Sequence, residues 1–165
     1  TAASQGLFTA LDPNIRAALI PDADAYRARF KSWLPSVSLL KLSEEDARWL
    51  GGTPHEWLSA GPSAVVITQG SDGLTAFTQG GAVHSVPGEQ VDVVDTIGAG
   101  DTVNAALLHG LSTRNALTPT GLTDLGADDW QQLLRYAARA AALTCSRAGA
   151  QPPYASELGG FPDLR

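Results

Sequence analysis

Short apolar runs alternate with amphipathic segments through the first 86 residues, and this alternation constrains the fold more than any other feature. The runs suit strands, whereas the segments between them repeat apolar residues at helical spacing. Strands that alternate with helices predict a mostly parallel sheet with helices on both faces, a three-layer α/β/α fold. The expected strands are 7–11, 37–42, 64–68, 74–78 and 82–86, and the expected helices are 22–34, 44–50 and a short helix that begins at residue 54.

A glycine-rich turn joins an apolar run to a helical pattern between residues 91 and 111. The run 91–94 is rich in valine and predicts a further strand. Gly98, Ala99 and Gly100 are small enough to let backbone amides approach a ligand where a helix begins with unpaired N–H groups. Because the helix dipole is positive at that end, the turn is predicted to bind an anion. The apolar face of the expected helix consists of Val103, Ala106, Leu107 and Leu111.

Asp101 follows these glycines, and an acid in a first helical turn is by itself an ordinary N-terminal preference. The whole string DTIGAGDT, residues 95–102, is more specific, because it resembles the second signature of the ribokinase-like (PfkB) carbohydrate kinases. The resemblance implies that Gly98, Ala99 and Gly100 hold the γ-phosphate of ATP. It also implies that Asp101 is the catalytic base, which accepts the proton of a sugar hydroxyl as the phosphoryl group arrives.

The first expected strand leads into the segment DPNIR, residues 12–16, at a strand end where doubly wound sheets collect their ligands. Taken alone, these residues favour an Asx turn and a solvated arginine. The segment also resembles the equivalent stretch of fructokinases and 2-keto-3-deoxygluconate kinases within the PfkB family. This resemblance implies that Asn14 and Arg16, together with Asp101, bind the sugar.

Two further segments resemble nucleotide-binding motifs of the family. In KLSEED, residues 41–46, Ser43 is expected to cap a helix whose acids complement its dipole. Glu44 matches the acid of the family's N-x-x-E motif, which helps to place magnesium and phosphate, and Lys41 stands where other members carry Asn. The resemblance therefore implies that Lys41 and Glu44 contact MgATP.

TQGSDG, residues 68–73, predicts the turn of a hairpin. It also resembles the T-x-G-x-x-G motif that touches the nucleotide in this family, which implies that Thr68, Gly70 and Gly73 contact ATP.

The segment SRAGAQP, residues 146–152, follows the last expected helix and resembles the C-terminal loop of these kinases. In family members that depend on potassium, this loop and the first Asp of the signature bind the ion. The resemblance implies that Asp95 and Gly149 are candidate K⁺ ligands. Asp128 or Asp129 is expected to cap the helix itself, and the preceding segment 112–127 is expected to be a surface loop.

The charge of the chain argues against polyanionic partners. Its 165 residues carry a formal net charge of -6 with only 11 Lys and Arg and no basic run, so we expect neither nucleic acid nor a membrane surface as a partner. The single cysteine, Cys145, cannot form an internal disulfide, and the apolar segments are short, so a cytoplasmic location is expected. His55, His84 and His109 follow no metal-binding spacing.

We interpret residues 1–165 as the C-terminal part of a ribokinase-like sugar kinase. The resemblance implies an N-terminal half with most sugar-binding residues and a small β lid that often forms a dimer interface, and neither is recognisable in this chain. We therefore expect the chain alone to bind ATP weakly without phosphorylating sugar, and the complete enzyme to be a homodimer.

The leading hypothesis is that the protein is a fructokinase, which converts ATP and D-fructose into ADP and fructose 6-phosphate. A 2-keto-3-deoxygluconate kinase or another PfkB sugar kinase is the alternative. A non-catalytic sugar- or nucleotide-binding regulator on the same scaffold is the alternative of another class, and the presence of Asp101 argues against it.

Overall fold

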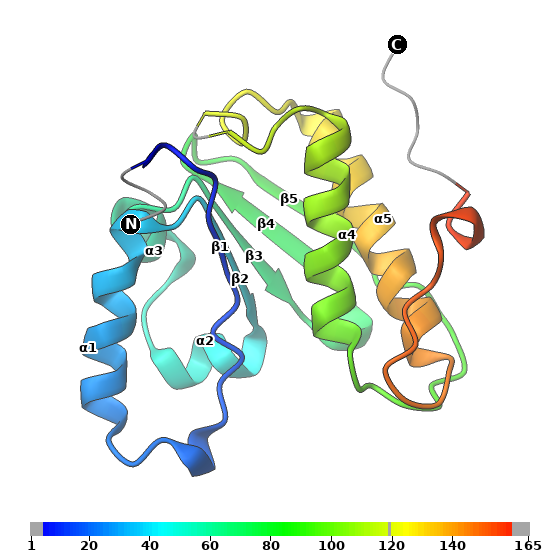
Figure 1. Cartoon of the computed structure of the whole chain (residues 1–165), viewed down its shortest axis with the longest axis horizontal. Helices are drawn as coiled ribbons and strands as arrows, with labels where there is room; N and C mark the ends of the chain where they lie inside the picture. The colour runs from blue at the N-terminus through cyan, green and yellow to red at the C-terminus, as the bar shows by residue number, and fades with distance from the viewer. Residues whose placement is uncertain (1–4, 119, 160–165) are drawn as a thin grey trace.

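A mixed five-stranded sheet forms the centre of the protein, and the computed structural model describes residues 5–118 and 120–159 (Figure 1). The strand order is β1-β2-β3-β4-β5. β1, β2 and β3 are parallel, β4 is antiparallel to β3, and β5 is antiparallel to β4. β5 therefore points the same way as the three parallel strands, and the sheet is mostly parallel, as expected. The strands are β1 (Ala10–Leu11), β2 (Leu39–Ser43), β3 (Ala64–Thr68), β4 (Leu74–Thr78) and β5 (Val83–Val86).

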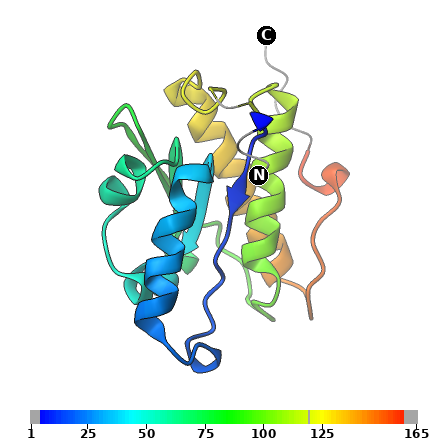
Figure 2. The same ribbon diagram turned by 60° about the vertical axis from the view of Figure 1, so that its left-hand side comes forward.

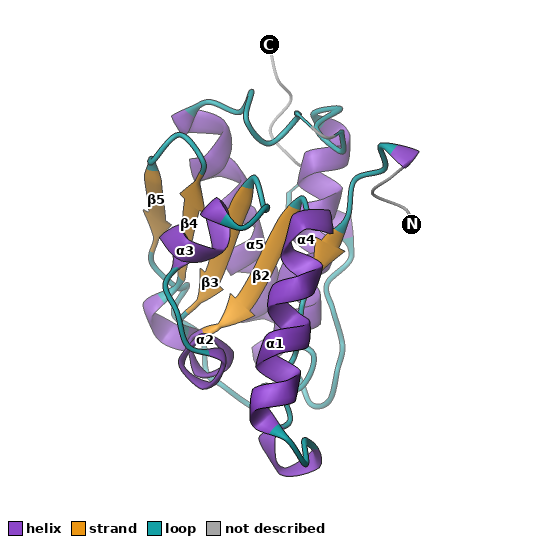
Figure 3. Ribbon diagram, turned by 90° about the vertical axis from the view of Figure 1, so that its left-hand side faces the viewer, coloured by secondary structure: helices purple, strands orange, loops and turns teal. Residues whose placement is uncertain are grey.

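Helices cover both faces of the sheet and give the α/β fold its three layers (Figure 3). Side chains alternate along β2, so that Leu39 faces one layer and Leu40 faces the other. On the first face, α4 (Ala99–Thr113) and α5 (Ala127–Cys145) pack over the sheet around the fully buried Trp130. On the second face lie α1 (Ala23–Trp33), α2 (Glu44–Leu50) and α3 (Pro54–Ser59).

Local capping explains where the helices of the second face begin. The Asp22 side chain accepts the N–H of Ala25 at 2.9 Å at the start of α1. Ser43 ends β2 and caps α2, where its side chain accepts the N–H of Asp46 at 3.0 Å. The chain therefore passes directly from the end of a strand into a helix at the edge of the sheet where β1 and β3 also end.

Apart from shifts of one or two residues at the ends of elements, three sequence expectations differ from the structure, and the first concerns residues 91–94. This segment is irregular rather than a strand, and its Val93 and Val94 side chains are exposed. The backbone N–H groups of Val94 and Asp95 donate to the carbonyl of Cys145 at the end of α5, at 2.8 Å and 3.2 Å. The segment thus passes a helix end and not a strand edge, and this tertiary position overrides the β-branched preference of valine.

The second difference concerns the segment 112–127, which is only partly a surface loop. α4 continues to Thr113, and the side chains of Ala116 and Leu122 are buried in the core beside α4 and α5. The cap of α5 is Gly126 instead of Asp128 or Asp129, and the N–H of Gly126 donates to the Asp129 carboxylate at 3.1 Å. A segment without periodicity can still bury single apolar residues under a helix pair.

The third difference is the length of the first strand, which was expected to span 7–11 and comprises only Ala10–Leu11. β1 has one neighbour, β2, and lies at the border of the sheet (Figure 2). The N–H of Thr9 donates to the Ser38 hydroxyl at 3.2 Å instead of to a backbone carbonyl, which ends the ladder. None of the helices in the described part of the chain combines the length and apolar character needed to cross a membrane.

Candidate active site

The turn before α4 has the backbone that an anion site requires. Gly98 adopts the left-handed region with φ of 80° and is the N-cap of the helix. A Cβ there would lie 2.8 Å from the Ala150 side chain, so both the backbone angle and the space require glycine. The N–H of Ala99 donates to the Thr96 carbonyl at 3.2 Å, whereas the N–H groups of Gly100 and Asp101 have no carbonyl of the preceding turn to pair with. The helix therefore presents its positive end at Gly98, Ala99 and Gly100.

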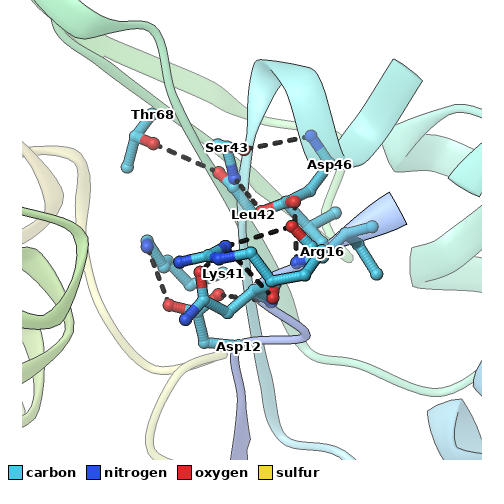
Figure 4. A network of polar contacts seen from close by, with 9 residues as sticks. Asp12, Arg16, Lys41, Leu42, Ser43, Asp46 and Thr68 are labelled. Atoms are coloured by element: carbon cyan, nitrogen blue, oxygen red, sulfur yellow. Dashed lines mark hydrogen bonds and ion pairs between the residues drawn. The ribbon is translucent and has the colours of Figure 1, made fainter. Parts of the chain in front are cut away.

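Lys41 brings a positive charge to the same turn. Its side chain is only 4% exposed, and its Nζ lies 3.0 Å from the position that a Cβ of Gly100 would occupy. The ammonium donates to Asp12 Oδ2 at 2.8 Å, as Figure 4 shows. Asp101 is the next residue of the helix, and its side chain is exposed. The turn thus combines helix N–H groups, a buried cation and an exposed carboxylate.

A cavity of about 370 Å³ opens beside this turn between the sheet and the C-terminal part of α5. Ala99 and Gly100 line it from the start of α4. Thr68, Gly70 and Gly73 line it from the β3–β4 hairpin, so the structure brings three of the five expected ATP contacts and two of the three residues of the expected anion site to one cavity.

Sequence reasoning missed the far wall of the cavity, which consists of Ala138, Ala141, Ala142 and Cys145 on α5 and of Val91 and Val93. The four α5 residues repeat at helical spacing, so they had the pattern of a core stripe. Small side chains at consecutive positions of such a stripe are the signal that marks room for a ligand. Burial and the charge of Asp95 raise the pKa of the Cys145 thiol, which keeps it in the neutral form.

Asp95 connects the loop that precedes α4 with the loop that follows α5. Its carboxylate accepts the N–H of Ile97 at 3.0 Å and the N–H of Gly149 at 2.9 Å. The two candidate K⁺ ligands, Asp95 and Gly149, are therefore in direct contact. The N–H groups of Ile97 and Gly149 stabilise the charged carboxylate and lower the pKa of Asp95 below that of an ordinary aspartate.

This contact predicts a pH-dependent stability. Because its folded pKa is depressed, Asp95 contributes stability that is complete above the unfolded pKa, about 4, and is lost as the pH falls through the lower folded pKa. The difference in unfolding free energy between wild type and Asp95→Asn should be constant from about pH 7 to 5 and shrink below about pH 4. Urea unfolding at each pH measures it, with Asp92→Asn in the same segment as the control. A difference that does not change with pH would contradict this account.

The candidate sugar-binding residues, Asn14 and Arg16, lie on a loop whose backbone N–H groups donate to the carboxylates of Asp12 and Asp46. Asp12 Oδ1 accepts the N–H of Asn14 at 3.3 Å, which is the expected Asx turn, and Asn14 has a φ of 43°. The Arg16 guanidinium donates to Asn14 Oδ1 at 2.7 Å, and both side chains are exposed. The N–H of Ile15 donates to Asp46 Oδ1 at 2.9 Å, which ties this loop to α2.

Glu44 lies apart from the contacts between the sugar loop and α2. Its carboxylate is 61% exposed and faces Arg48 at 3.5 Å on the outer side of α2, so its contact with MgATP stays a prediction. Asp46, which was expected only to complement the helix dipole, is the buried acid of the segment and also accepts the N–H of Ser43 at 3.3 Å. The spacing of Ser43 and Asp46 is that of a capping box, and this pattern turns the acid back toward the strand end.

Comparison with known proteins shows the family of the chain. A family model described as pfkB family carbohydrate kinase matches residues 1–157. The chain belongs to this family. A fructokinase of Rhizobium leguminosarum bv. trifolii is 40% identical over 121 residues, which are 70% of this chain and 37% of that protein. A fructokinase of Escherichia coli is 32% identical over 152 residues, 88% of this chain and 47% of that protein.

Solved structures also match the fold of the chain. A fructokinase of Xylella fastidiosa with bound ATP has a TM-score of 0.77 at 25% identity, over 90% of this chain and 49% of that one. An aminoimidazole riboside kinase of Salmonella enterica, complexed with aminoimidazole riboside and an ATP analogue, has a TM-score of 0.77 at 23% identity. It covers 93% of this chain and 52% of the other, and supports the fold alone. The chain spans about half, or less, of the length of the curated relatives it matches.

Proposed function

We propose that the protein transfers the γ-phosphoryl group of MgATP to a hydroxyl group of a sugar. The observation that carries this proposal is that the cavity beside the β3–β4 hairpin ends at the N-terminal turn of α4, with Asp101 as the next side chain. A nucleotide in the cavity would place its terminal phosphate at Gly98, Ala99 and Gly100. Backbone N–H groups and the helix dipole would then stabilise the charge of the phosphoryl group during transfer.

Asp101 is the base of the proposed reaction. A carboxylate is a weak base toward an alcohol, so it takes the hydroxyl proton only as the bond between the sugar oxygen and phosphorus forms. Its exposed position leaves it open to an acceptor that approaches from outside the cavity. Most of the rate enhancement would come from holding the acceptor and the phosphoryl group in line.

Thr68, Gly70 and Gly73 are proposed to contact the nucleotide, and Lys41 to contact its phosphates. Glu44 is proposed to help place Mg²⁺, which arrives with ATP and is held largely by the phosphates. Asp95 and Gly149 are proposed to lie beside a monovalent cation such as K⁺. A Vibrio cholerae fructokinase was crystallised with fructose, ADP and potassium, which supports the use of such an ion in this fold.

Fructose is the proposed acceptor, because the relatives of this chain at 40% and 32% identity are named fructokinases. A keto-deoxy sugar acid is the second candidate, since the exposed Arg16 guanidinium can pair with a carboxylate. The test is an ATP-coupled assay of the complete protein that carries this sequence, with fructose, 2-keto-3-deoxygluconate, ribose and glucose as acceptors. Efficient turnover of the sugar acid with little turnover of fructose would reverse the ranking, and no turnover of any sugar would reject the proposal.

Filling the cavity tests the nucleotide site without catalysis. Ala141 lines the cavity from α5 and is partly exposed. The substitution Ala141→Trp places a large ring in that space, and we expect it to weaken ATP binding at least about tenfold. Titration calorimetry measures the affinity, with Arg139→Trp on the exposed side of α5 as the matched control. Equal affinity in both variants would exclude this cavity as the nucleotide site.

A further inference from the structure

Lys41 is a buried cation with one acidic partner in the described part of the chain. It lies on β2 and points toward α4, and only 4% of its side chain is exposed. Its Nζ donates to Asp12 Oδ2 at 2.8 Å, and the Asp12 side chain is itself only 12% exposed. A charge removed from water is tolerated when an opposite charge accompanies it. The charge of Asp12 therefore offsets the free-energy cost of burying the Lys41 ammonium.

The position of the ammonium is unfavourable without that partner. Nζ lies against Gly100 in the first turn of α4, at the positive end of the helix dipole, which repels a cation. A lysine side chain is a flexible four-carbon stem, so nothing in the residue itself fixes where its ammonium lies. The contact with Asp12 opposes the repulsion and holds Nζ beside Gly100.

The ammonium keeps donors for a ligand. It has three N–H groups, and the contact with Asp12 uses one of them. We propose that Asp12 is a positioning residue, which holds the Lys41 ammonium against Gly100 so that this ammonium contacts the phosphoryl group during transfer. The inference rests on the proposed sugar kinase function and adds to it a residue that acts through another and touches neither substrate.

The two carboxylate oxygens of Asp12 make different contacts, so a substitution can remove the contact with Lys41 and keep the contact with Asn14. Asp12 Oδ1 accepts the N–H of Asn14 in the turn that carries the candidate sugar-binding residues. Asparagine supports the same Asx turn, but it lacks the charge that pairs with Lys41. Asp12→Asn therefore keeps the sugar loop and weakens the hold on Lys41, whereas Asp12→Ala removes both.

Lysine labelling tests the position of Lys41 without catalysis. The chain has two lysines, Lys31 and Lys41, and Lys31 is exposed on α1 and serves as the internal standard. We expect a soluble amine reagent to modify Lys41 far more slowly than Lys31 in the wild type. Asp12→Asn should raise the rate at Lys41 relative to Lys31 by about tenfold, the usual effect of losing a hydrogen bond between charged groups. Peptide mass spectrometry measures both rates, and Asp24→Asn, which breaks an exposed ion pair with Arg27, should leave them unchanged.

A double-mutant cycle in the complete protein tests whether Asp12 acts through Lys41. We expect Asp12→Asn to lower kcat at least about tenfold and to leave KM for the sugar nearly unchanged. In a Lys41→Met background the same change should alter kcat by less than about twofold, because the group that it positions is gone. Thermal unfolding of each variant confirms that the fold persists.

An unchanged labelling rate, or a loss of kcat that persists in the Lys41→Met background, would overturn the inference. A raised KM for the sugar with normal kcat would do so as well, because it would make Asp12 a sugar ligand. Failure of the wild type to phosphorylate any sugar rejects the proposed function, and with it the role in transfer. An active wild type with unchanged labelling rejects only the role of Asp12.

Discussion

Asp101→Asn is expected to lower kcat for sugar phosphorylation by about two to four orders of magnitude, which is the usual range for a lost general base. Asparagine has nearly the same shape but cannot accept the hydroxyl proton. Affinity for ATP should stay close to that of the wild type, because Asp101 is exposed and the walls of the cavity are unchanged. Steady-state kinetics of the complete protein, together with ATP titration, measure the two effects.

The control for this substitution is Asp128→Asn. Asp128 is also exposed and also lies in the first turn of a long helix, α5. If Asp101 only complements its helix dipole, the two substitutions should have the same small effect on stability and none on turnover. Near-normal turnover of Asp101→Asn, in protein shown by mass to contain no wild type, would reduce Asp101 to that structural role.

Gly100→Val should abolish measurable transfer, with a loss of at least about two to three orders of magnitude in kcat. A Cβ at residue 100 already lies 3.0 Å from Lys41 Nζ, and the two further methyl groups of valine need more space. The side chain would push the ammonium aside and cover the first N–H groups of α4. The phosphoryl group would then lose both the cation and the amides.

Gly80→Val is the matched control, because a Cβ at Gly80 meets no atom within 4 Å. Circular dichroism and thermal unfolding should show that both variants are folded. Tight ATP binding with normal turnover in Gly100→Val would contradict the anion site at the start of α4.

Much of the fold could be predicted from local patterns. β3 and β4 begin and end at the predicted residues, because each is an apolar run bounded by strong turn residues. The start of α2 was also predicted, since Ser43 is a strong capping residue. The run 91–94 was predicted wrongly, because its β-branched residues have the composition of a strand while the neighbouring element is the end of α5. The composition of a segment gives its preference for strand or helix, but the tertiary fold determines which element lies beside it.

The candidate site could be proposed from sequence where one segment carries the chemistry, and less completely where two segments meet. The glycine turn and Asp101 lie in one continuous string, so the sequence could assign them together. The ion pair of Lys41 with Asp12 joins residues 29 positions apart, and sequence spacing does not predict such a contact. The wall formed by Ala138, Ala141 and Ala142 had the pattern of a core helix, because small apolar residues suit both a core and a ligand pocket.

Transfer of labelled γ-phosphate from ATP to fructose, in the presence of Mg²⁺, is the direct test of the proposed kinase reaction. The complete protein that carries this sequence is incubated with both substrates, and the product is identified by chromatography and phosphorus NMR. We expect fructose-dependent formation of a sugar phosphate by the wild type and by Asp128→Asn, and a loss of about two to four orders of magnitude with Asp101→Asn. ATP binding without transfer to any sugar, or equal transfer by wild type and Asp101→Asn, would contradict it.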